Sequence, residues 1–362
     1  MENAPAEAVR VVDMGVQTDT FLEDVLAGLR KPQRELPSKY FYDRRGSALF
    51  DEITELDEYY PTRTELAIMA EHMDEIVSSV GDEAMIVEYG SGSSSKTRIL
   101  LDHLVDPAAY VPIDISRGYL LETAASLAES YPSIEVLPVV ADYTQSLELP
   151  RPTRVPRRVV GYFPGSTIGN FDHDAARGFV SGVAHAVAAG GGFLIGVDLK
   201  KDPVILERAY NDAKGVTAEF NLNVLHRMNR ELGADFDLDQ FEHVAFWSED
   251  KGRIEMHLRS AVDQVVHVGS AAFRFEEGET IHTENCHKFT VEEFGDLVRP
   301  WFEQRHVWVD DKGLFSVQYL VVQMAGHSAP LGRGTAVHGH GPPLEGAAEA
   351  TTCGSRRALG SG

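Results

Sequence analysis

A glycine-rich segment in the first third of the chain has the residue types to hold a small polar ligand. The sequence EYGSG, residues 88–92, lies between an apolar run and a segment of helical periodicity. Glycines there let the backbone approach a ligand closely, and the Glu88 carboxylate can accept hydrogen bonds from an ammonium group. A dinucleotide site would have a third glycine where this chain has Ser95. The motif therefore favours a ligand without phosphates, although a plain tight turn would use the same glycines.

Two acidic residues end the next two apolar runs. Asp114 lies 22 residues after Gly92, near the spacing at which an acidic side chain accepts hydrogen bonds from ribose hydroxyls. Asp142 and Tyr143 end the following run, where a carboxylate can accept from an adenine amino group and a ring can stack on the base. Each residue alone would also suit a helix cap or a turn. Together with the glycine motif they favour a nucleoside-containing ligand.

A polar loop follows the fourth apolar run, with the sequence FPGSTIGN at residues 163–170. Exposed amides near Gly165 and the side chain of Asn170 can hold a carboxylate or an amine beside the first ligand. The alternative is structural, because Ser166 or Thr167 could cap a short helix.

The elements that must position these residues alternate between buried strands and amphipathic helices, which is typical of a parallel sheet covered by helices. We therefore expect an α/β fold with a Rossmann-like sheet. The apolar runs cover residues 84–90, 110–116, 134–143, 157–166 and 191–199, and the amphipathic segments cover residues 95–105, 118–132 and 172–190. Residues 305–324 favour an antiparallel hairpin turning at DDKG, and class I methyltransferases end in such a hairpin.

Residues 202–285 break this alternation with a long helical stretch at 205–232 and strand-like segments at 254–260 and 262–277. We interpret them as a smaller α+β lobe, inserted into the sheet domain, that binds substrate. The expected division is 1–60 and 202–285 for this lobe, 61–201 and 286–324 for the sheet domain, and 325–362 for a disordered tail. The tail is rich in Gly, Ala and Pro, with too little apolar surface to offset the entropy of ordering it.

The composition excludes several classes of function. The chain has 56 acidic and 33 basic residues and a formal charge of −23, which argues against nucleic acid or an anionic membrane as a partner. No leader-like or membrane-spanning apolar run is present in the sequence, so we expect a cytoplasmic protein, and a monomer. Its two cysteines, Cys286 and Cys353, have no metal-ligand spacing. We expect no metal site, although His338 and His340 could bind one.

The sequence resembles the histidine-specific N-α-methyltransferases of ergothioneine biosynthesis over about residues 36–322. The resemblance is carried by long strings at residues 37–65, 88–101, 165–171, 208–238, 241–247, 253–259 and 282–289, the last being HTENCHKF. It implies an S-adenosylmethionine-binding sheet domain and an amino-acid-binding lobe. It also implies three methyl transfers to the α-amino nitrogen of L-histidine, which would give the trimethylammonium betaine hercynine.

The resemblance also implies roles for individual residues. The methyl donor would be held by Glu88, Gly90, Asp114, Asp142 and Tyr143, and we add Ser91, Gly92 and Lys96 from the same segment. The substrate's amino and carboxylate groups would be held by Tyr42, Gly165, Asn170 and Tyr210, of which the first three would orient the reacting amine. The side-chain pocket would be lined by Tyr59, Met256 and Glu284, with Glu284 pairing to the imidazole.

One residue departs from the family pattern. The chain has Cys286 where these enzymes carry a serine, and a thiol is a weaker hydrogen-bonding group than a hydroxyl. Cys286 would then either weaken a second bond to the imidazole or be a small buried residue without a role. The substrate could therefore be a histidine derivative, tryptophan or tyrosine, although Glu284 suits an indole or a phenol poorly. A cofactor-binding protein without catalysis is a further alternative, which the retained substrate residues oppose.

Overall fold

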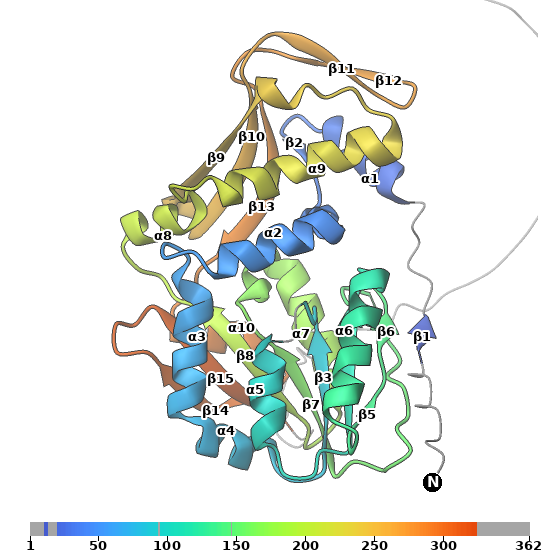
Figure 1. The fold of residues 1–362 in the computed structure, drawn as a ribbon. Helices are drawn as coiled ribbons and strands as arrows, with labels where there is room; N and C mark the ends of the chain where they lie inside the picture. Colours follow the sequence, from blue (N-terminus) through green and yellow to red (C-terminus); the bar gives the residue numbers. More distant parts are fainter. Residues whose placement is uncertain (1–10, 14–19, 93–94, 146, 324–362) are drawn as a thin grey trace, which may run out of the picture. The chain divides into compact units, whose positions relative to one another are not determined.

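A large sheet of nine strands, parallel in its centre, forms the lower layer of Figure 1. The computed structural model describes residues 11–13, 20–92, 95–145 and 147–323. The strand order is β1-β6-β4-β3-β7-β8-β15-β14, with β5 beside β4. The strands are β1 (Val12–Asp13), β3 (Ala84–Tyr89), β4 (Ala109–Asp114), β5 (Glu135–Val136), β6 (Val139–Val140), β7 (Arg158–Phe163), β8 (Gly192–Asp198), β14 (Phe302–Val309) and β15 (Phe315–Val322).

The pairing directions confirm the expected Rossmann-like α/β sheet. Strands β6, β4, β3, β7 and β8 are parallel, whereas β15 runs antiparallel to β8 and to β14. The two last strands are therefore the antiparallel hairpin predicted from residues 305–324. Because β6, β4, β3 and β7 are parallel, their carboxyl ends meet at one edge, where α/β sheets bind ligands.

Helices cover both faces of this sheet. On one face lie α3 (Tyr60–Glu71), α4 (Met73–Val80), α5 (Ser95–His103) and α6 (Arg117–Ser130), and on the other lie α7 (His173–Val187) and α10 (Val291–Val298). Within β3, Ile86 packs toward the first set, whereas Met85 and Val87 pack toward the second. Burial on both faces explains why the strands have nearly continuous apolar sequences.

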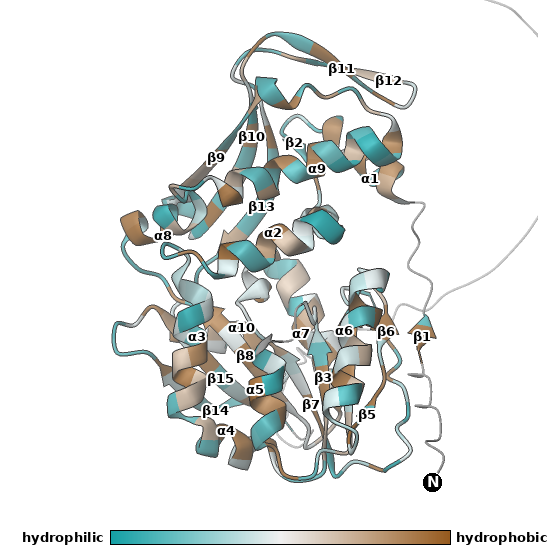
Figure 2. Cartoon of the chain, in the orientation of Figure 1, coloured by the Kyte–Doolittle hydropathy of each residue, from teal (hydrophilic) through white to brown (hydrophobic). Residues whose placement is uncertain are grey.

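A second sheet of four strands carries its own apolar core (Figure 1). Its strand order is β2 (Arg34–Glu35), β13 (Thr280–His287), β10 (Arg253–Ser260) and β9 (Phe241–Ser248), and β11 (Gln264–Val268) and β12 (Ala271–Phe275) form a separate hairpin. Helices α1 (Thr20–Leu29), α2 (Arg44–Thr54), α8 (Pro203–Tyr210) and α9 (Val216–Leu232) contribute to this core. Hydrophobic and hydrophilic residues both recur along α9 in Figure 2, as on an amphipathic helix.

The prediction of one long helix at residues 205–232 is wrong, because the chain forms two helices there. Helix α8 ends at Tyr210, and α9 begins at Val216 after Gly215, whose φ is +77°. The Asp212 carboxylate accepts hydrogen bonds from the backbone amides of Val216 and Thr217, at 3.0 and 2.8 Å. A side chain that satisfies the first amides of a helix favours a new start at that point.

The division of the chain at residues 60, 201 and 285 stays a prediction. Residues 1–324 form one compact unit that contains both sheets. Within the expected N-terminal part of the smaller lobe, β1 pairs with β6 of the large sheet. Strand β13 continues across residue 285 to His287. The structure thus shows two sheets built from interleaved segments.

No helix among the described residues has the length and apolar character needed to cross a membrane. The expected disordered tail, with His338, His340 and Cys353, lies outside the described residues.

Candidate active site

A cavity of about 240 Å³ opens at the carboxyl edge of the large sheet. It brings together the residues that follow β3, β4, β6 and β7, as the strand order predicts. All eight residues expected to hold a methyl donor line it: Glu88, Gly90, Ser91, Gly92, Lys96, Asp114, Asp142 and Tyr143. We call this space the donor cavity.

Glu88 is the most deeply buried carboxylate of the donor cavity, with 1% of its surface exposed. The hydroxyl of Thr97 donates to Oε2 over 2.5 Å, and the hydroxyl of Tyr110 donates to the same oxygen. Burial raises the pKa of Glu88 to about 7, although both hydroxyls act in the opposite direction. Both of these bonds end on Oε2.

Asp114 and Asp142 stabilise local turns as well as lining the donor cavity. The Ser116 amide donates to Oδ1 of Asp114 over 2.8 Å, just before α6 begins. The amide and hydroxyl of Thr144 donate to Oδ1 of Asp142 over 3.0 and 2.6 Å. The turn contacts are compatible with the predicted ligand role of both residues, because a carboxylate has acceptor capacity for both.

Gly90 and Gly92 have the positive φ angles, +73° and +45°, that favour glycine. A Cβ atom on Gly90 would lie 3.5 Å from the ring of Tyr143, inside the space between the strand end and that ring. Tyr143 is fixed by edge-on contacts with Tyr89 and Phe163. The backbone thus leaves room beside an aromatic face, as a stacked base would need.

Lys96 has a fixed partner that the sequence did not reveal. Its ammonium forms an ion pair with Oε2 of Glu65 over 2.5 Å, and the same carboxylate accepts from the Gly165 amide over 3.0 Å. Glu65 is 1% exposed, on the sheet-facing side of α3. A Cβ atom on Gly196 would lie 2.3 Å from Glu65 Oε1, so a side chain at this position of β8 would displace the carboxylate. Glu65 therefore joins the glycine-rich segment to the polar loop.

A second, smaller cavity of about 40 Å³ adjoins the first. All eight residues expected to bind substrate line it: Tyr42, Tyr59, Gly165, Asn170, Tyr210, Met256, Glu284 and Cys286. The two cavities share six lining residues, which are Tyr42, Phe50, Tyr59, Gly165, Thr167 and Asn170. We call the second space the acceptor cavity.

The polar loop after β7 joins the large sheet to β13. The Asn170 amide donates to Oε1 of Glu284 over 3.1 Å. Burial raises the pKa of Glu284 to about 7, and the charge of Lys288 opposes this shift. The structural alternative of a cap by Ser166 is only partly met, because Ser166 precedes the short helix Thr167–Asn170 but makes no side-chain bond to it. Its hydroxyl instead accepts from the backbone amide of Asp198, on β8, over 2.8 Å.

Three tyrosines and a cysteine complete the acceptor cavity. The Tyr210 hydroxyl donates to the sulfur of Cys286 over 2.8 Å, and both residues are buried. Burial raises the pKa of Tyr42 well above its usual value and also raises that of Tyr59. These hydroxyls are therefore neutral at physiological pH and can both donate and accept.

Comparison with known proteins identifies the family. A profile described as histidine-specific methyltransferase, SAM-dependent, matches residues 21–322. The chain belongs to this family. The histidine N-alpha-methyltransferase of Mycolicibacterium smegmatis is 44% identical over 305 residues, which cover 82% of this chain and 94% of that relative. Its namesake in Mycobacterium tuberculosis is 41% identical over 302 residues, covering 81% of this chain and 92% of that relative.

A third relative is more distant. Ergothioneine biosynthesis protein 1 of Neurospora crassa is 31% identical over 267 residues, which cover 68% of this chain and 30% of that relative. These matches confirm the family resemblance seen in the sequence, and this chain is an S-adenosylmethionine-dependent methyltransferase.

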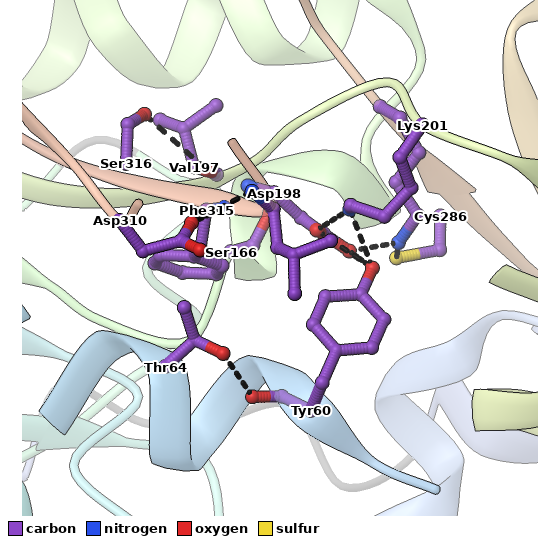
Figure 3. Close-up of polar contacts among 12 residues, drawn as sticks. Tyr60, Thr64, Ser166, Val197, Asp198, Lys201, Cys286, Asp310, Phe315 and Ser316 are labelled. Carbon is purple, nitrogen blue, oxygen red and sulfur yellow. Dashed lines mark hydrogen bonds and ion pairs between the residues drawn. The ribbon is translucent and has the colours of Figure 1, made fainter. Parts of the chain in front are cut away.

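The wall of the acceptor cavity of this methyltransferase includes part of a buried polar cluster that sequence reasoning missed (Figure 3). It consists of Tyr60, Asp198, Lys201 and Lys288. Of these, Lys288 donates to Tyr210 and Cys286. The sequence carried one weak signal for this cluster. Asp198 and Lys288 each adjoin apolar strand residues that predict burial. A charge in such a run needs a buried partner.

One group among the described residues has the spacing of a metal site. Ligand atoms of Glu255, His257 and His282 lie within 4.8 Å of one another. Oε1 of Glu255 is already paired with Arg253 at 2.6 Å and with Lys251 at 2.8 Å. Two cations beside the only carboxylate of the group oppose binding of a divalent ion.

Proposed function

We propose that this methyltransferase transfers methyl groups from S-adenosylmethionine to the α-amino nitrogen of L-histidine, three times, to give hercynine for ergothioneine biosynthesis. The observation that carries the proposal is the shared wall between the two cavities. Six residues line both, so ligands in the two spaces would meet at Tyr42, Gly165 and Asn170. The names of the two mycobacterial relatives, and of the relative from Neurospora crassa, support the substrate and the pathway.

The donor cavity fits S-adenosylmethionine by its chemistry. Oε1 of Glu88 would accept from the ammonium group of the donor, and Asp114 would accept from its ribose hydroxyls. Asp142 would accept from the adenine amino group, and Tyr143 would stack on the ring. The bound donor supplies an electrophilic methyl group on a sulfonium, whose sulfur keeps the electron pair and leaves as a neutral thioether.

Catalysis by this chain would consist mainly of positioning. The amine must present a lone pair toward the donor cavity, and an aligned near-attack geometry supplies a large part of the barrier reduction. Tyr42 would accept an N–H of the neutral amine, while the Gly165 loop and Asn170 would hold it from the opposite side. Each transfer forms an N–C bond and adds a positive charge to nitrogen, so one N–H proton must leave before the next. A tyrosine hydroxyl or water would pass this proton to solvent.

The acceptor cavity suits an imidazole. Glu284 would accept the N–H of one ring nitrogen in a charge-assisted hydrogen bond. The sulfur of Cys286 already accepts from Lys288 and Tyr210, at 3.0 and 2.8 Å. Its own S–H is therefore free to point toward the second ring nitrogen, as a weak donor. The Cys286 position would then retain the second contact in weakened form.

A second candidate keeps the reaction and changes the amino acid, and the observation that favours it is Cys286 itself. A thiol tolerates apolar neighbours better than a hydroxyl, which would suit tryptophan, tyrosine or a histidine derivative. A cofactor-binding protein without catalysis is not proposed, because the chain belongs to a methyltransferase family. We further propose that the enzyme acts as a monomer in the cytoplasm, which light scattering and cell fractionation would test.

The proposal is tested by incubating the protein with S-adenosylmethionine and an equimolar mixture of the twenty amino acids. Mass spectrometry should show successive methyl increments on histidine alone. Increments on an aromatic amino acid, with histidine unchanged, would favour the second candidate. A mixture without any methylated amino acid would contradict both.

A further inference from the structure

The ammonium of Lys288 is buried completely and uses all three of its donors. It lies 2.7 Å from Oδ2 of Asp198, 3.0 Å from the hydroxyl of Tyr210 and 3.0 Å from the sulfur of Cys286. Its side chain is 0% exposed. Burying an ammonium costs free energy unless the charge is paired. We therefore asked what a buried charge contributes in the wall of a binding cavity.

The charges of this cluster do not cancel. Asp198, the only carboxylate in it, accepts from Lys288, from Lys201 at 2.5 Å and from the Tyr60 hydroxyl at 2.8 Å (Figure 3). The two lysines hold the pKa of Asp198 below its usual value, and burial lowers the pKa of Lys201 to about 8. At neutral pH one negative charge therefore faces two positive charges, which leaves one positive charge at the wall of the acceptor cavity.

Tyr210 connects this charge to the cavity. Its hydroxyl accepts from Lys288 and donates to the sulfur of Cys286, and all three residues line the acceptor cavity. A hydroxyl that accepts from a cation is a stronger donor, and sulfur is a weak acceptor. Turning this O–H from sulfur to a carboxylate oxygen would therefore be favourable.

We infer that Lys288 is a positioning residue for the substrate's α-carboxylate, acting through the hydroxyl of Tyr210. This inference rests on the proposed function, in which an amino acid with a neutral amine binds as an anion. The carboxylate supplies the negative charge that balances the cluster, and Tyr210 supplies the contact. Glu284 is the competing anion, because the charge of Lys288 also opposes the rise of its pKa on burial. The two roles predict different behaviour toward a ligand that has an imidazole and no carboxylate.

Histamine is such a ligand, and the experiment compares it with histidine by calorimetry in the presence of S-adenosylhomocysteine. The wild-type enzyme should bind histidine more tightly than histamine. Lys288→Met should reduce the ratio of the histidine affinity to the histamine affinity at least tenfold. The reduction should come from weaker histidine binding, with histamine and S-adenosylhomocysteine bound as before. In a Tyr210→Phe background, the same substitution should change the ratio much less, because the connecting hydroxyl is gone.

Two further variants control for folding. Lys288→Gln keeps N–H donors for Asp198 and Tyr210 without the charge. If Lys288→Met does not fold, Lys288→Gln replaces it and should show the same reduced ratio of histidine to histamine affinity. Tyr60→Phe removes the hydrogen bonds that the Tyr60 hydroxyl donates to Asp198 and accepts from Lys201. It alters neither the number of charges nor a hydrogen bond of Tyr210, and it should keep the wild-type ratio of histidine to histamine affinity.

Several results would overturn the inference. If Lys288→Gln weakens histidine and histamine equally, Lys288 serves Glu284 or the fold alone. An unchanged ratio in a folded variant would also remove the role of Lys288, while leaving histidine as the substrate. Wild-type protein that binds neither compound would overturn the proposed substrate and, with it, this role.

Discussion

The side-chain amide of Asn170 donates to the carboxylate of Glu284 over 3.1 Å, and this bond joins the two sheets at the site. Asn170 ends the polar loop after β7, whereas Glu284 lies on β13 of the smaller sheet. Residues proposed to hold the reacting amine and the substrate side chain are thus in direct contact. Changes at one end of the substrate should affect alignment at the other.

The clearest effect on substrate choice is expected from Glu284→Ala. Loss of the charge-assisted bond should reduce kcat/KM for histidine by roughly ten- to a hundredfold, equivalent to about 1.5–3 kcal/mol, and should relatively favour tryptophan. Glu284→Gln keeps an acceptor for Asn170 and should lose less. Steady-state kinetics with both amino acids measures this, and unchanged histidine selectivity in the Ala variant would show that other residues recognise the side chain.

For Cys286→Ser, we expect tighter histidine binding. A hydroxyl is a better donor to the second imidazole nitrogen than a thiol, and the gain should be about 0.5–1.5 kcal/mol, or two- to tenfold in Kd. Tyr210 and Lys288 would keep an acceptor at this position. Calorimetry with S-adenosylhomocysteine present is the test; weaker binding would mean that the hydroxyl donates elsewhere.

The methyl-donor site is tested by Asp114→Ala. Removing the acceptor for the ribose hydroxyls should weaken binding of S-adenosylhomocysteine by about 1.5–3 kcal/mol, roughly ten- to a hundredfold. Asp174→Ala is the matched control, because this residue is exposed on α7 and lines neither cavity. Equal affinities for both variants would place the ribose away from Asp114.

A pH-dependent stability effect is expected from Glu88. Its pKa is about 7 in the fold against 4.5 for an ordinary glutamate, so the folded protein holds more protons than the unfolded chain between these values. Stability from this group therefore falls as pH rises from 4.5 to 7 and stays low above 7. The full difference is about 3 kcal/mol.

Glu88→Gln should accordingly stabilise the donor-free protein above pH 7 and have little effect near pH 4.5. The amide oxygen can still accept from Thr97 and Tyr110. The same variant should bind the methyl donor more weakly, because the ammonium loses a charged acceptor. Denaturant unfolding at several pH values measures the first effect, and a pH-independent difference between the two proteins would refute the assigned pKa.

The sequence alone predicted those site residues that directly follow an apolar strand. Glu88, Gly90, Ser91, Gly92, Asp114 and Asp142 were predicted to lie at one sheet edge, and all six line the donor cavity. The reason is geometric, since parallel strands end at the same edge and an apolar run reveals each strand. The residues of the acceptor cavity were predicted from the family resemblance, because Tyr42, Tyr210 and Glu284 are far apart in sequence and follow no periodic pattern.

Other features depend on contacts that a single sequence does not encode locally. In the sequence, Glu65 looks like a surface position on a helix, yet it is buried and links Lys96 of α5 to the Gly165 amide of the polar loop. In the sequence, Lys288 is a charged residue that directly follows a strand. In the structure it is buried and paired with Asp198, which lies 90 residues earlier. The break between α8 and α9 depends on Asp212 acting as a cap, which overrides helical periodicity.

The central claim is that the α-amino nitrogen of histidine receives three methyl groups. The most direct measurement is NMR of the product made from histidine and S-adenosylmethionine labelled with ¹³C in its transferable methyl group. The account predicts one signal from three equivalent methyl groups on a quaternary α-nitrogen. A labelled methyl group on an imidazole nitrogen, or no label in histidine, would contradict it.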